Sequence, residues 1–372
     1  MMNRPTSLPY RLGTFLASVT RISLPGPRVR RMLAVAAMTW CLGFAGAPGA
    51  DDALPGGRRA LPLEWQGEWI GNGVAFSPYR DGQKPDGASP SEAEILSDLR
   101  LVARYWHFIR VYDASEVSET AVRLIERERL PIRVILGAWL VDDVKPADRK
   151  KNREQVANAI RIANAYPGTV AAVCAGNEAG VVWSDHRTSP EKLVGWLNQI
   201  RSSIRQPVTC ADDYNFWNKE ASKPVAAAVD FIMLHAYALW NGKPLESAMQ
   251  WTAGKYDACC QFHPGVPVVI GETGWATSHD PKRVGEGAEG TAMRAEVSVA
   301  AQEIYLRQHF RWVNERKVPT FLFEAFDEAW KGGGDEMPAT IAEKHWGVFD
   351  AQRRPKASFE AVAKEFFPSQ RP

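Results

Sequence analysis

The sequence predicts a single (β/α)8 barrel with a binding cleft at the carboxyl ends of its strands. Eight short apolar runs alternate with amphipathic stretches from about residue 66 onward. Each run is continuously apolar, which is typical of parallel strands covered on both faces. Acidic and aromatic residues gather where the runs end, and reactive groups in this fold stand at those ends. A chain of 372 residues needs no second domain for such a barrel.

The expected strands are the eight apolar runs, taken in chain order. They are Trp69–Phe76, Phe108–Tyr112, Ile132–Ala138, Val170–Ala175, Pro207–Ala211, Val229–Ala236, Val266–Gly271 and Thr320–Phe326. No glycine-rich phosphate turn follows the first run, so a closed barrel is favoured over an open doubly wound sheet.

Helical patterns separate the runs. Ser89-Pro90-Ser91-Glu92 offers a helix start, with its first serine as the N-cap, proline at the first helical position and glutamate at the third. Ser189-Pro190 opens another helix in the same way. A long pattern runs from Met293 to Val313, and a final one runs from Lys356 to Phe367.

The first 50 residues are expected to be a targeting segment. Three arginines precede an apolar run over residues 32–45, and small residues follow it. This order is typical of a secretory signal peptide, and the run is short for a membrane span. We therefore expect a periplasmic or secreted protein, or a membrane anchor through residues 32–45 if the segment is not cleaved. Residues 51–65 are expected to be a flexible lead-in, and residues 66–372 to be the catalytic domain.

Composition excludes several classes of partner. The chain has 45 basic and 43 acidic residues without a basic block, so nucleic acid is not expected. The seven histidines lack metal-ligand spacing, and we expect neither a metal nor another cofactor. The sequence does not decide the disulfide state of Cys174, Cys210, Cys259 and Cys260.

Two carboxylates at strand ends form the candidate catalytic pair. Glu178 follows the fourth run and Glu272 follows the seventh. Strands four and seven lie across the barrel from each other, so both carboxylates can face one pocket. Glycoside hydrolysis needs such a pair, in which one acid protonates the leaving oxygen while the other attacks the anomeric carbon or activates water. Alternatively, each glutamate is a structural carboxylate that caps a helix or pairs with an arginine such as Arg110.

Several short motifs occur in the order found in a known family. They are Ser77-Pro78-Tyr79, Arg110-Val111-Tyr112, Gly176-Asn177-Glu178, His235-Ala236-Tyr237, Gly271-Glu272-Thr273-Gly274-Trp275, the segment from Phe323 to Lys331, and His345-Trp346-Gly347-Val348-Phe349. The chain resembles glycoside hydrolase family 17, in its bacterial and fungal branch, over roughly residues 70 to 350. The resemblance implies a retaining mechanism on β-1,3-linked glucan, with Glu178 as acid/base and Glu272 as nucleophile. In that mechanism the two carboxyl groups lie about 5–5.5 Å apart.

Arg110, Asn177 and Tyr237 are expected to support this pair and to bind the substrate. Arg110 and Tyr237 are the expected hydrogen-bond partners that keep Glu272 ionised. Asn177 is placed to bond the 2-hydroxyl of the sugar, an interaction that strengthens in the transition state.

The other expected substrate contacts are acids, aromatics and one lysine at the same rim. They are Tyr79, Tyr112, Asp113, Trp139, Trp275, Glu324, Glu328, Trp330 and Lys331. Carboxylates bond sugar hydroxyls, and aromatic faces stack on the apolar face of a pyranose. Trp275 and Trp330 are the preferred platforms because each closely follows a strand-end carboxylate. The aromatics could instead be core, and Glu324, Glu328 and Lys331 could form a structural ion-pair cluster.

Different functions remain open at this point. A retaining enzyme would hydrolyse glucan or transfer it to another sugar, and the aromatic crowding after the eighth run favours transfer. The alternative is a catalytically inactive barrel that acts as a glucan-binding module. A barrel phosphatase or aldolase is disfavoured, because no expected strand ends in lysine and no phosphate motif is present.

Overall fold

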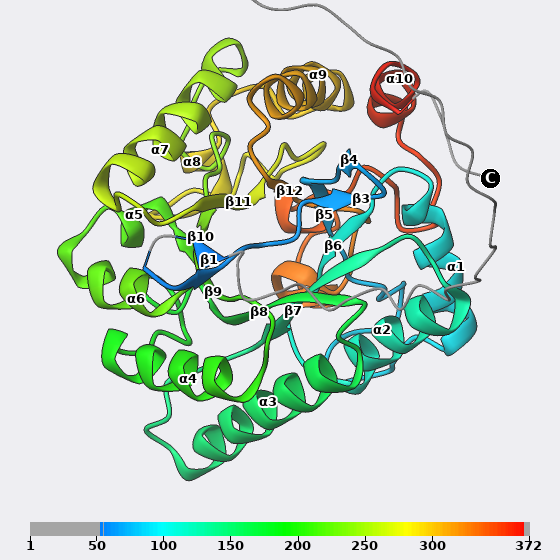
Figure 1. Cartoon of the computed structure of the whole chain (residues 1–372). Helices are drawn as coiled ribbons and strands as arrows, with labels where there is room; N and C mark the ends of the chain where they lie inside the picture. Colours follow the sequence, from blue (N-terminus) through cyan, green and yellow to red (C-terminus); the bar gives the residue numbers. More distant parts are fainter. Residues whose placement is uncertain (1–52, 55, 368–372) are drawn as a thin grey trace, which may run out of the picture. The chain divides into compact units, whose positions relative to one another are not determined.

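The computed structural model describes residues 53–54 and 56–367, and it shows a closed parallel barrel inside a ring of helices (Figure 1). Its strands follow one another round the barrel in chain order, and the last strand pairs with the first. They are β5 (Asn72–Ala75), β6 (Phe108–Arg110), β7 (Arg133–Ala138), β8 (Val170–Asn177), β9 (Val208–Asp213), β10 (Phe231–His235), β11 (Val268–Thr273) and β12 (Thr320–Leu322). Each strand overlaps one of the eight apolar runs, so the predicted (β/α)8 fold is confirmed.

The strands are apolar without alternation because both of their faces are buried. In β10, Phe231 and Met233 pack inside the barrel, whereas Ile232 and Leu234 pack against the surrounding helices. A parallel sheet covered on both sides therefore needs an apolar residue at nearly every position.

The helices cover the outside of the barrel, and short helical turns lie in its loops. The helices are α1 (Glu92–Ala103), α2 (Glu116–Glu128), α3 (Pro146–Ala165), α4 (Pro190–Ser203), α5 (Tyr214–Trp217), α6 (Lys223–Ala228), α7 (Ala248–Phe262), α8 (Glu289–Ala292), α9 (Val299–Arg316) and α10 (Ala357–Phe366). The 3-10 turns are η1 (Glu220–Ser222), η2 (Leu245–Ser247), η3 (Lys331–Glu336) and η4 (Ala342–Lys344).

Local capping decides where two of the predicted helices begin. Helix α1 is capped by Ser91, not by Ser89 as predicted. The Ser91 side chain accepts from the backbone N–H of Glu94, whose carboxylate reaches back to the Ser91 N–H, forming a complete capping box. Helix α4 begins as predicted, with Ser189 as its N-cap and proline at the first helical position.

Helix α9 begins later than the predicted start at Met293. The Ser298 side chain accepts a hydrogen bond from the backbone N–H of Ala301 and so caps the helix there. The residues before Ser298 thus belong to the long loop that follows β11. The final helix, α10, begins one residue after the predicted start at Lys356, which is its N-cap.

The segment before β5 covers the end of the barrel where the strands begin (Figure 1). It contains two short antiparallel pairs, β1 (Ala53–Leu54) with β2 (Arg58–Arg59) and β3 (Glu64–Trp65) with β4 (Glu68–Trp69). The Arg59 guanidinium donates to the carbonyls of Ile204 and Gln206, at 3.0 and 2.9 Å. Leu61 and Leu63 pack against the apolar residues inside the barrel. In place of the flexible lead-in expected over 51–65, the chain is docked on the barrel from Arg58 onward.

Other sequence predictions concern the remainder of the chain. The expected targeting segment, residues 1–50, lies outside the described residues. Within the described part, no helix has the length and apolar character needed to cross a membrane. Cys174, Cys210, Cys259 and Cys260 are free thiols, and the first three are buried.

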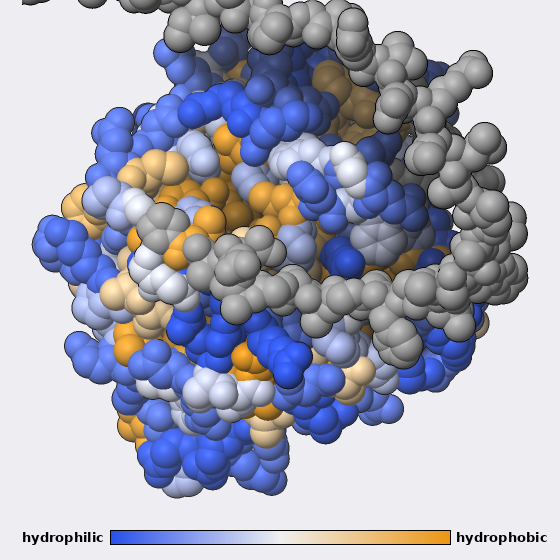
Figure 2. Space-filling view, viewed as in Figure 1, coloured by the Kyte–Doolittle hydropathy of each residue, from blue (hydrophilic) through white to orange (hydrophobic). Residues whose placement is uncertain are grey.

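Hydrophilic residues predominate over the outer helices on the face drawn in Figure 2.

Candidate active site

A cavity of about 1370 Å³ opens at the carboxyl ends of the strands. Both candidate catalytic glutamates line it, together with most of the predicted substrate contacts. The predicted residues that line it are Tyr79, Tyr112, Asp113, Trp139, Asn177, Glu178, Tyr237, Glu272, Glu328, Trp330 and Lys331. The position of this cavity confirms the predicted cleft at the carboxyl face of the barrel.

Glu178 sits on an unusual backbone at the end of β8. Its φ of 48° lies in the left-handed region, which L-residues other than glycine rarely adopt, and Gly176 just before it has a φ of 84°. The Glu178 backbone N–H donates to the carbonyl of Ala211 on β9 at 2.9 Å, which holds this turn against the neighbouring strand. Strained backbone persists where the surroundings fix it, and here it places a carboxylate at the cavity with 29% of its side chain exposed.

Glu272 lies inside β11 and is almost fully buried, with 5% of the residue exposed. Its Oε1 accepts from Nη1 of Arg110 at 2.8 Å, and its Oε2 accepts from the hydroxyl of Tyr237 at 2.7 Å. Both predicted hydrogen-bond partners of Glu272 are therefore confirmed.

These contacts keep Glu272 ionised despite its burial. Burial on its own would raise the pKa of Glu272, because it removes water from the charged form. The imidazole of His235, the guanidinium of Arg110 and the hydroxyls of Tyr237 and Tyr112 together outweigh burial and hold the pKa of Glu272 below its ordinary value. A buried carboxylate that stays charged has the property required of a nucleophile.

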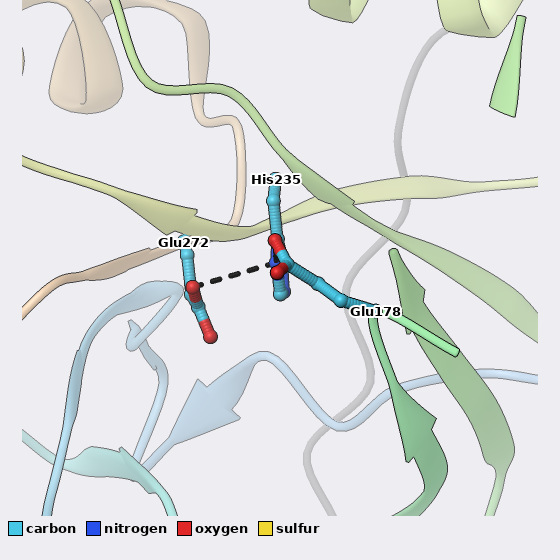
Figure 3. Close-up of side chains that lie close together, drawn as sticks. All are labelled: Glu178, His235 and Glu272. Atoms are coloured by element: carbon cyan, nitrogen blue, oxygen red, sulfur yellow. Dashed lines mark hydrogen bonds and ion pairs between the residues drawn. The ribbon is translucent and has the colours of Figure 1, made fainter. Parts of the chain in front are cut away.

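His235, which was not among the predicted site residues, lies beside both glutamates (Figure 3). Its Nδ1 is 2.9 Å from Oε1 of Glu178 and 3.4 Å from Oε2 of Glu272, while its Nε2 is 3.0 Å from Nη1 of Arg110. Because a guanidinium can only donate, Nε2 is the acceptor and the ring proton is on Nδ1. His235 thus presents one N–H to the pair of carboxylates. The HxY motif at the end of the sixth run was the signal for this residue.

The two glutamates are close enough to act on one sugar ring. One oxygen of Glu178, one oxygen of Glu272 and one ring nitrogen of His235 lie within 4.8 Å of one another. These three atoms are also possible metal ligands, which the sequence spacing did not indicate. Their closeness is accounted for by the His235 N–H, which bonds to one carboxylate and faces the other.

Arg110 is buried and does not line the cavity, so it contacts Glu272 and Asn177 and not, as predicted, the substrate. Its side chain is 1% exposed, and its Nη2 donates to Oδ1 of Asn177 at 2.5 Å, which leaves the Asn177 amide nitrogen free to donate into the cavity. The guanidinium also lies over the Tyr112 ring, 4.6 Å from its centroid. The buried Tyr112 hydroxyl faces the Glu272 carboxylate and helps to hold the pKa of Glu272 low.

Lys331 binds two carboxylates at once. Its Nζ lies 2.5 Å from Glu324 and 2.8 Å from Glu328, so the predicted alternative of an ion-pair cluster is correct for their arrangement. Oε1 of Glu328 accepts from the indole N–H of Trp330 at 2.8 Å and from the hydroxyl of Ser77. Glu324 is 1% exposed and does not line the cavity, so the prediction of direct substrate contact is wrong for this residue.

The predicted sugar platform at Trp275 is also wrong. Trp275 is 1% exposed, does not line the cavity and stacks on Tyr305 of α9 at a centroid distance of 5.4 Å. Its indole N–H donates to the carbonyl of Glu296 at 3.0 Å. The backbone at Gly274 packs so tightly on Phe323 that an added Cβ would lie 2.1 Å from the carbonyl oxygen. Trp275 therefore belongs to the packing between β11 and α9.

The predicted aromatics that line the cavity are Tyr79, Tyr112, Trp139, Tyr237 and Trp330. Trp139 packs against the ring of His186 at 4.6 Å, and Tyr79 meets Trp330 edge to face at 6.0 Å. Asp113 lines the cavity as well, but its Oδ1 accepts from two serine hydroxyls near the start of α2. The Asp113 carboxylate thus also has a structural role.

Sequence reasoning missed further polar residues of the cavity. Asp213 is the last residue of β9, which extends two residues past the predicted end of the fifth run at Ala211. Burial raises the pKa of Asp213 to about 6, and the charge of Glu178 adds to the effect of burial. Glu343 of η4 also lines the cavity, and burial raises its pKa. An acid at a strand end was the signal for Asp213, whereas Glu343 lies in a loop far from any strand.

Comparisons with known proteins identify the family of this chain. The family model of the BtgE/BtgC glycoside hydrolase domain matches residues 73–347. A glucan 1,3-beta-glucosidase of Arthroderma benhamiae is 27% identical over 74% of this chain and 86% of its own length. A glucan 1,3-beta-glucosidase of Saccharomyces cerevisiae is 24% identical over 74% and 87%.

Solved structures show the same fold. An endo-laminarinase from Formosa has a TM-score of 0.68 at 20% identity and covers 81% of this chain and 90% of its own. A glycoside hydrolase family 17 beta-1,3-glucanosyltransferase from Rhizomucor miehei has a TM-score of 0.60 at 23% identity over 77% and 95%. The chain belongs to the BtgE/BtgC glycoside hydrolase family, and the resemblance to glycoside hydrolase family 17 is confirmed.

Proposed function

We propose that this chain is a retaining glycosidase or transglycosylase that acts on β-1,3-linked glucan. The observation that carries the proposal is the closeness of Glu178 and Glu272, which present oxygens within 4.8 Å of each other. Retaining enzymes hold their carboxyl groups about 5–5.5 Å apart, whereas inverting enzymes leave room for a water between them. The names of the relatives supply the substrate class, a β-1,3-glucan.

In the first step Glu272 is the nucleophile. It attacks the anomeric carbon while Glu178 gives its proton to the glycosidic oxygen, and the bond between that carbon and that oxygen breaks. Arg110 and Tyr237 each bind one oxygen of Glu272, which orients the anion before attack. The products of this step are a shortened glucan and a glycosyl-enzyme ester.

In the second step Glu178 acts as the base. It removes a proton from water or from a sugar hydroxyl, whose oxygen attacks the anomeric carbon and releases Glu272. Water gives hydrolysis and a bound sugar gives transfer, so acceptor binding decides the product. Aromatic side chains that line the cavity favour transfer, because a stacked sugar competes with water.

Product analysis tests this proposal. Purified protein is incubated with β-1,3-gluco-oligosaccharides of defined length, and the products are separated by size. We expect products longer than the substrate alongside shorter ones, and only shorter products would exclude transfer. Glu272→Gln and Glu178→Gln should each abolish turnover, whereas Glu315→Gln, an exposed position on α9, should not. Normal turnover by Glu272→Gln would reject the nucleophile assignment.

The alternative is a catalytically inactive barrel that binds glucan. It is less favoured because both carboxylates and their partners are in place and the relatives are named as enzymes. An unchanged oligosaccharide mixture after long incubation, with binding still detectable, would support this alternative.

Export is part of the proposal and rests on residues 1–50 alone. The segment is proposed to direct the protein to the periplasm or the medium, or to retain it at the membrane through residues 32–45 if it is not cleaved. Fractionation of the producing cells, followed by N-terminal sequencing, distinguishes these outcomes. A full-length protein in the cytosol would contradict export.

A further inference from the structure

Trp183 is the single exposed aromatic side chain in the part of the chain that the structure describes. Its exposed fraction is 55%, whereas the other described aromatic residues are buried or half-buried. No hydrogen bond or ring contact ties Trp183 to the rest of the described chain. The fold therefore makes no evident use of this indole.

Trp183 stands at the cavity that holds the catalytic pair. It lies in the loop between β8 and α4, five residues after Glu178, and it lines the same cavity as Glu178 and Asn177. A contiguous exposed apolar patch beside a binding cleft indicates an interaction surface, so the apolar neighbours of Trp183 decide its role.

Two exposed valines extend this surface outward. Val182 in the same loop is 66% exposed, and Val144 in the loop after β7 is 68% exposed. Both line a second hollow of about 500 Å³, and Asn215 lines this hollow and the main cavity. The two hollows are therefore neighbours. We call Val144, Val182 and Trp183 the apolar lip.

The lip has the chemistry of a sugar-binding surface. A pyranose ring offers an apolar face to an indole, and its hydroxyls need polar partners at the edge of the ring. Arg187, Lys219 and Asn215 line the second hollow beside the two valines. Lys192 and Asp142 also line this hollow and pair with each other, and the remaining polar groups can bond the hydroxyls of a sugar.

We propose that the apolar lip is a distal subsite for a glucan chain on the leaving-group side of the cleavage point. This inference rests on the proposed function. Glu178 must reach the glycosidic oxygen that departs, so the released chain lies on the Glu178 side of the cleft. The lip belongs to the loop that Glu178 begins and to the loop next to it. The same subsite then receives the acceptor sugar in transfer.

The dependence of rate on chain length tests the subsite. Wild type and Trp183→Ala are compared on β-1,3-gluco-oligosaccharides of three and seven sugars. We expect Trp183→Ala to lower the ratio of kcat/KM for the long substrate to that for the short one by roughly 2- to 10-fold, mainly through KM. We also expect fewer transfer products for each hydrolytic event. Trp183→Phe should retain most of the wild-type ratio. A wild-type ratio in Trp183→Ala would overturn the inference.

A matched control and a binding assay distinguish failure of the subsite inference from failure of the proposed function. Ile304→Ala removes another exposed apolar side chain, on α9 and away from both hollows, and should leave the ratio unchanged. Mobility in native gels containing soluble β-1,3-glucan reports binding without turnover. If wild type binds but does not cleave, the proposed function fails. Weaker retardation of Trp183→Ala would still support the subsite, and equal retardation would reject it.

Discussion

Arg110 on β6 and Glu272 on β11 are 162 positions apart in the chain, yet Nη1 of the arginine donates to Oε1 of the glutamate at 2.8 Å. The same guanidinium donates through Nη2 to Asn177, the residue before Glu178. The planar guanidinium of Arg110 thus orients both the Glu272 carboxylate and the Asn177 amide, which precedes Glu178. A lysine ammonium is a point charge and cannot reproduce this fork.

Arg110→Lys should therefore reduce kcat/KM by roughly 10²- to 10³-fold, because the nucleophile loses orientation as well as charge stabilisation. Since the guanidinium lowers the pKa of Glu272, the substitution should also move the acidic limb of the pH profile to higher pH. Steady-state kinetics between pH 4 and 8 measure both effects. Arg316→Lys, in a surface pair with Asp257, serves as the control. An unshifted acidic limb would contradict the assigned role of Arg110.

His235 is a positioning residue whose Nδ1–H faces both carboxylates. An asparagine amide nitrogen can occupy the place of Nδ1, whereas a glutamine amide reaches the place of Nε2. We therefore expect His235→Asn to retain more activity than His235→Gln, with losses of roughly 10- and 100-fold. The pH profile of activity should change more in His235→Gln, because that variant has no N–H at the place of Nδ1, between the two acids. Equal losses with an unchanged profile would indicate a merely structural role.

Asp213 makes stability depend on pH in a defined direction. Burial raises the pKa of Asp213 to about 6, so the folded state holds this proton more tightly than the unfolded state, where the pKa is about 3.9. The folded state therefore loses stability as pH rises from about 4 to 6, by up to about 3 kcal/mol. Asp213→Asn removes the charge and keeps an oxygen that can accept from the Asn215 backbone N–H.

Thermal unfolding at two pH values checks this direction. Asp213→Asn should unfold at a higher temperature than wild type at pH 7.5, and the difference should shrink toward pH 4. Asp335→Asn, an exposed position in η3, should show no such pattern. A variant that is less stable than wild type at pH 7.5 would count against a buried, raised-pKa carboxyl at this position.

Lys331 compensates two buried carboxylates, Glu324 and Glu328. Lys331→Met leaves both acids without their cation, and we expect a loss of about 3–5 kcal/mol in the free energy of unfolding. Adding Glu324→Gln in the same chain should restore part of the loss, because it removes one uncompensated charge. Chemical denaturation at pH 7 measures both variants. Failure of the second substitution to restore any stability would mean that packing, not charge, dominates here.

The sequence predicted the barrel well because burial on both faces of each strand leaves a continuous apolar signal. Phe231 to Leu234 alternate between the barrel interior and the helix layer, and all four are apolar because both sides are buried. The exact helix starts were harder to predict. Ser89 and Ser91 each offer a capping hydroxyl with a glutamate three positions later, and only the structure shows that Ser91 and Glu94 form the capping box. The docking of Arg59 depends on carbonyls more than a hundred positions away, which no local pattern can reveal.

The catalytic pair was predictable because a charge that ends an apolar strand is rare and has a known position in this fold. The residues that contact this pair were harder to predict from the sequence. His235 became a site residue only through its distances to Glu178 and Arg110, and those distances depend on how three strands twist relative to one another. Trp275 was misplaced for a related reason. Its short distance in sequence from Glu272 does not show on which side of the strand the indole lies.

Trp275 and Trp330 offer a direct contrast between core and cleft. Trp275→Ala removes a fully buried indole that stacks on Tyr305, so we expect a loss of about 3–5 kcal/mol in stability. Trp330→Ala removes a half-buried indole at the cavity and should instead raise KM for glucan by roughly 2- to 10-fold. Urea denaturation and steady-state kinetics on both variants measure these effects. A large rise in KM for Trp275→Ala without loss of stability would restore the sugar platform that the sequence suggested.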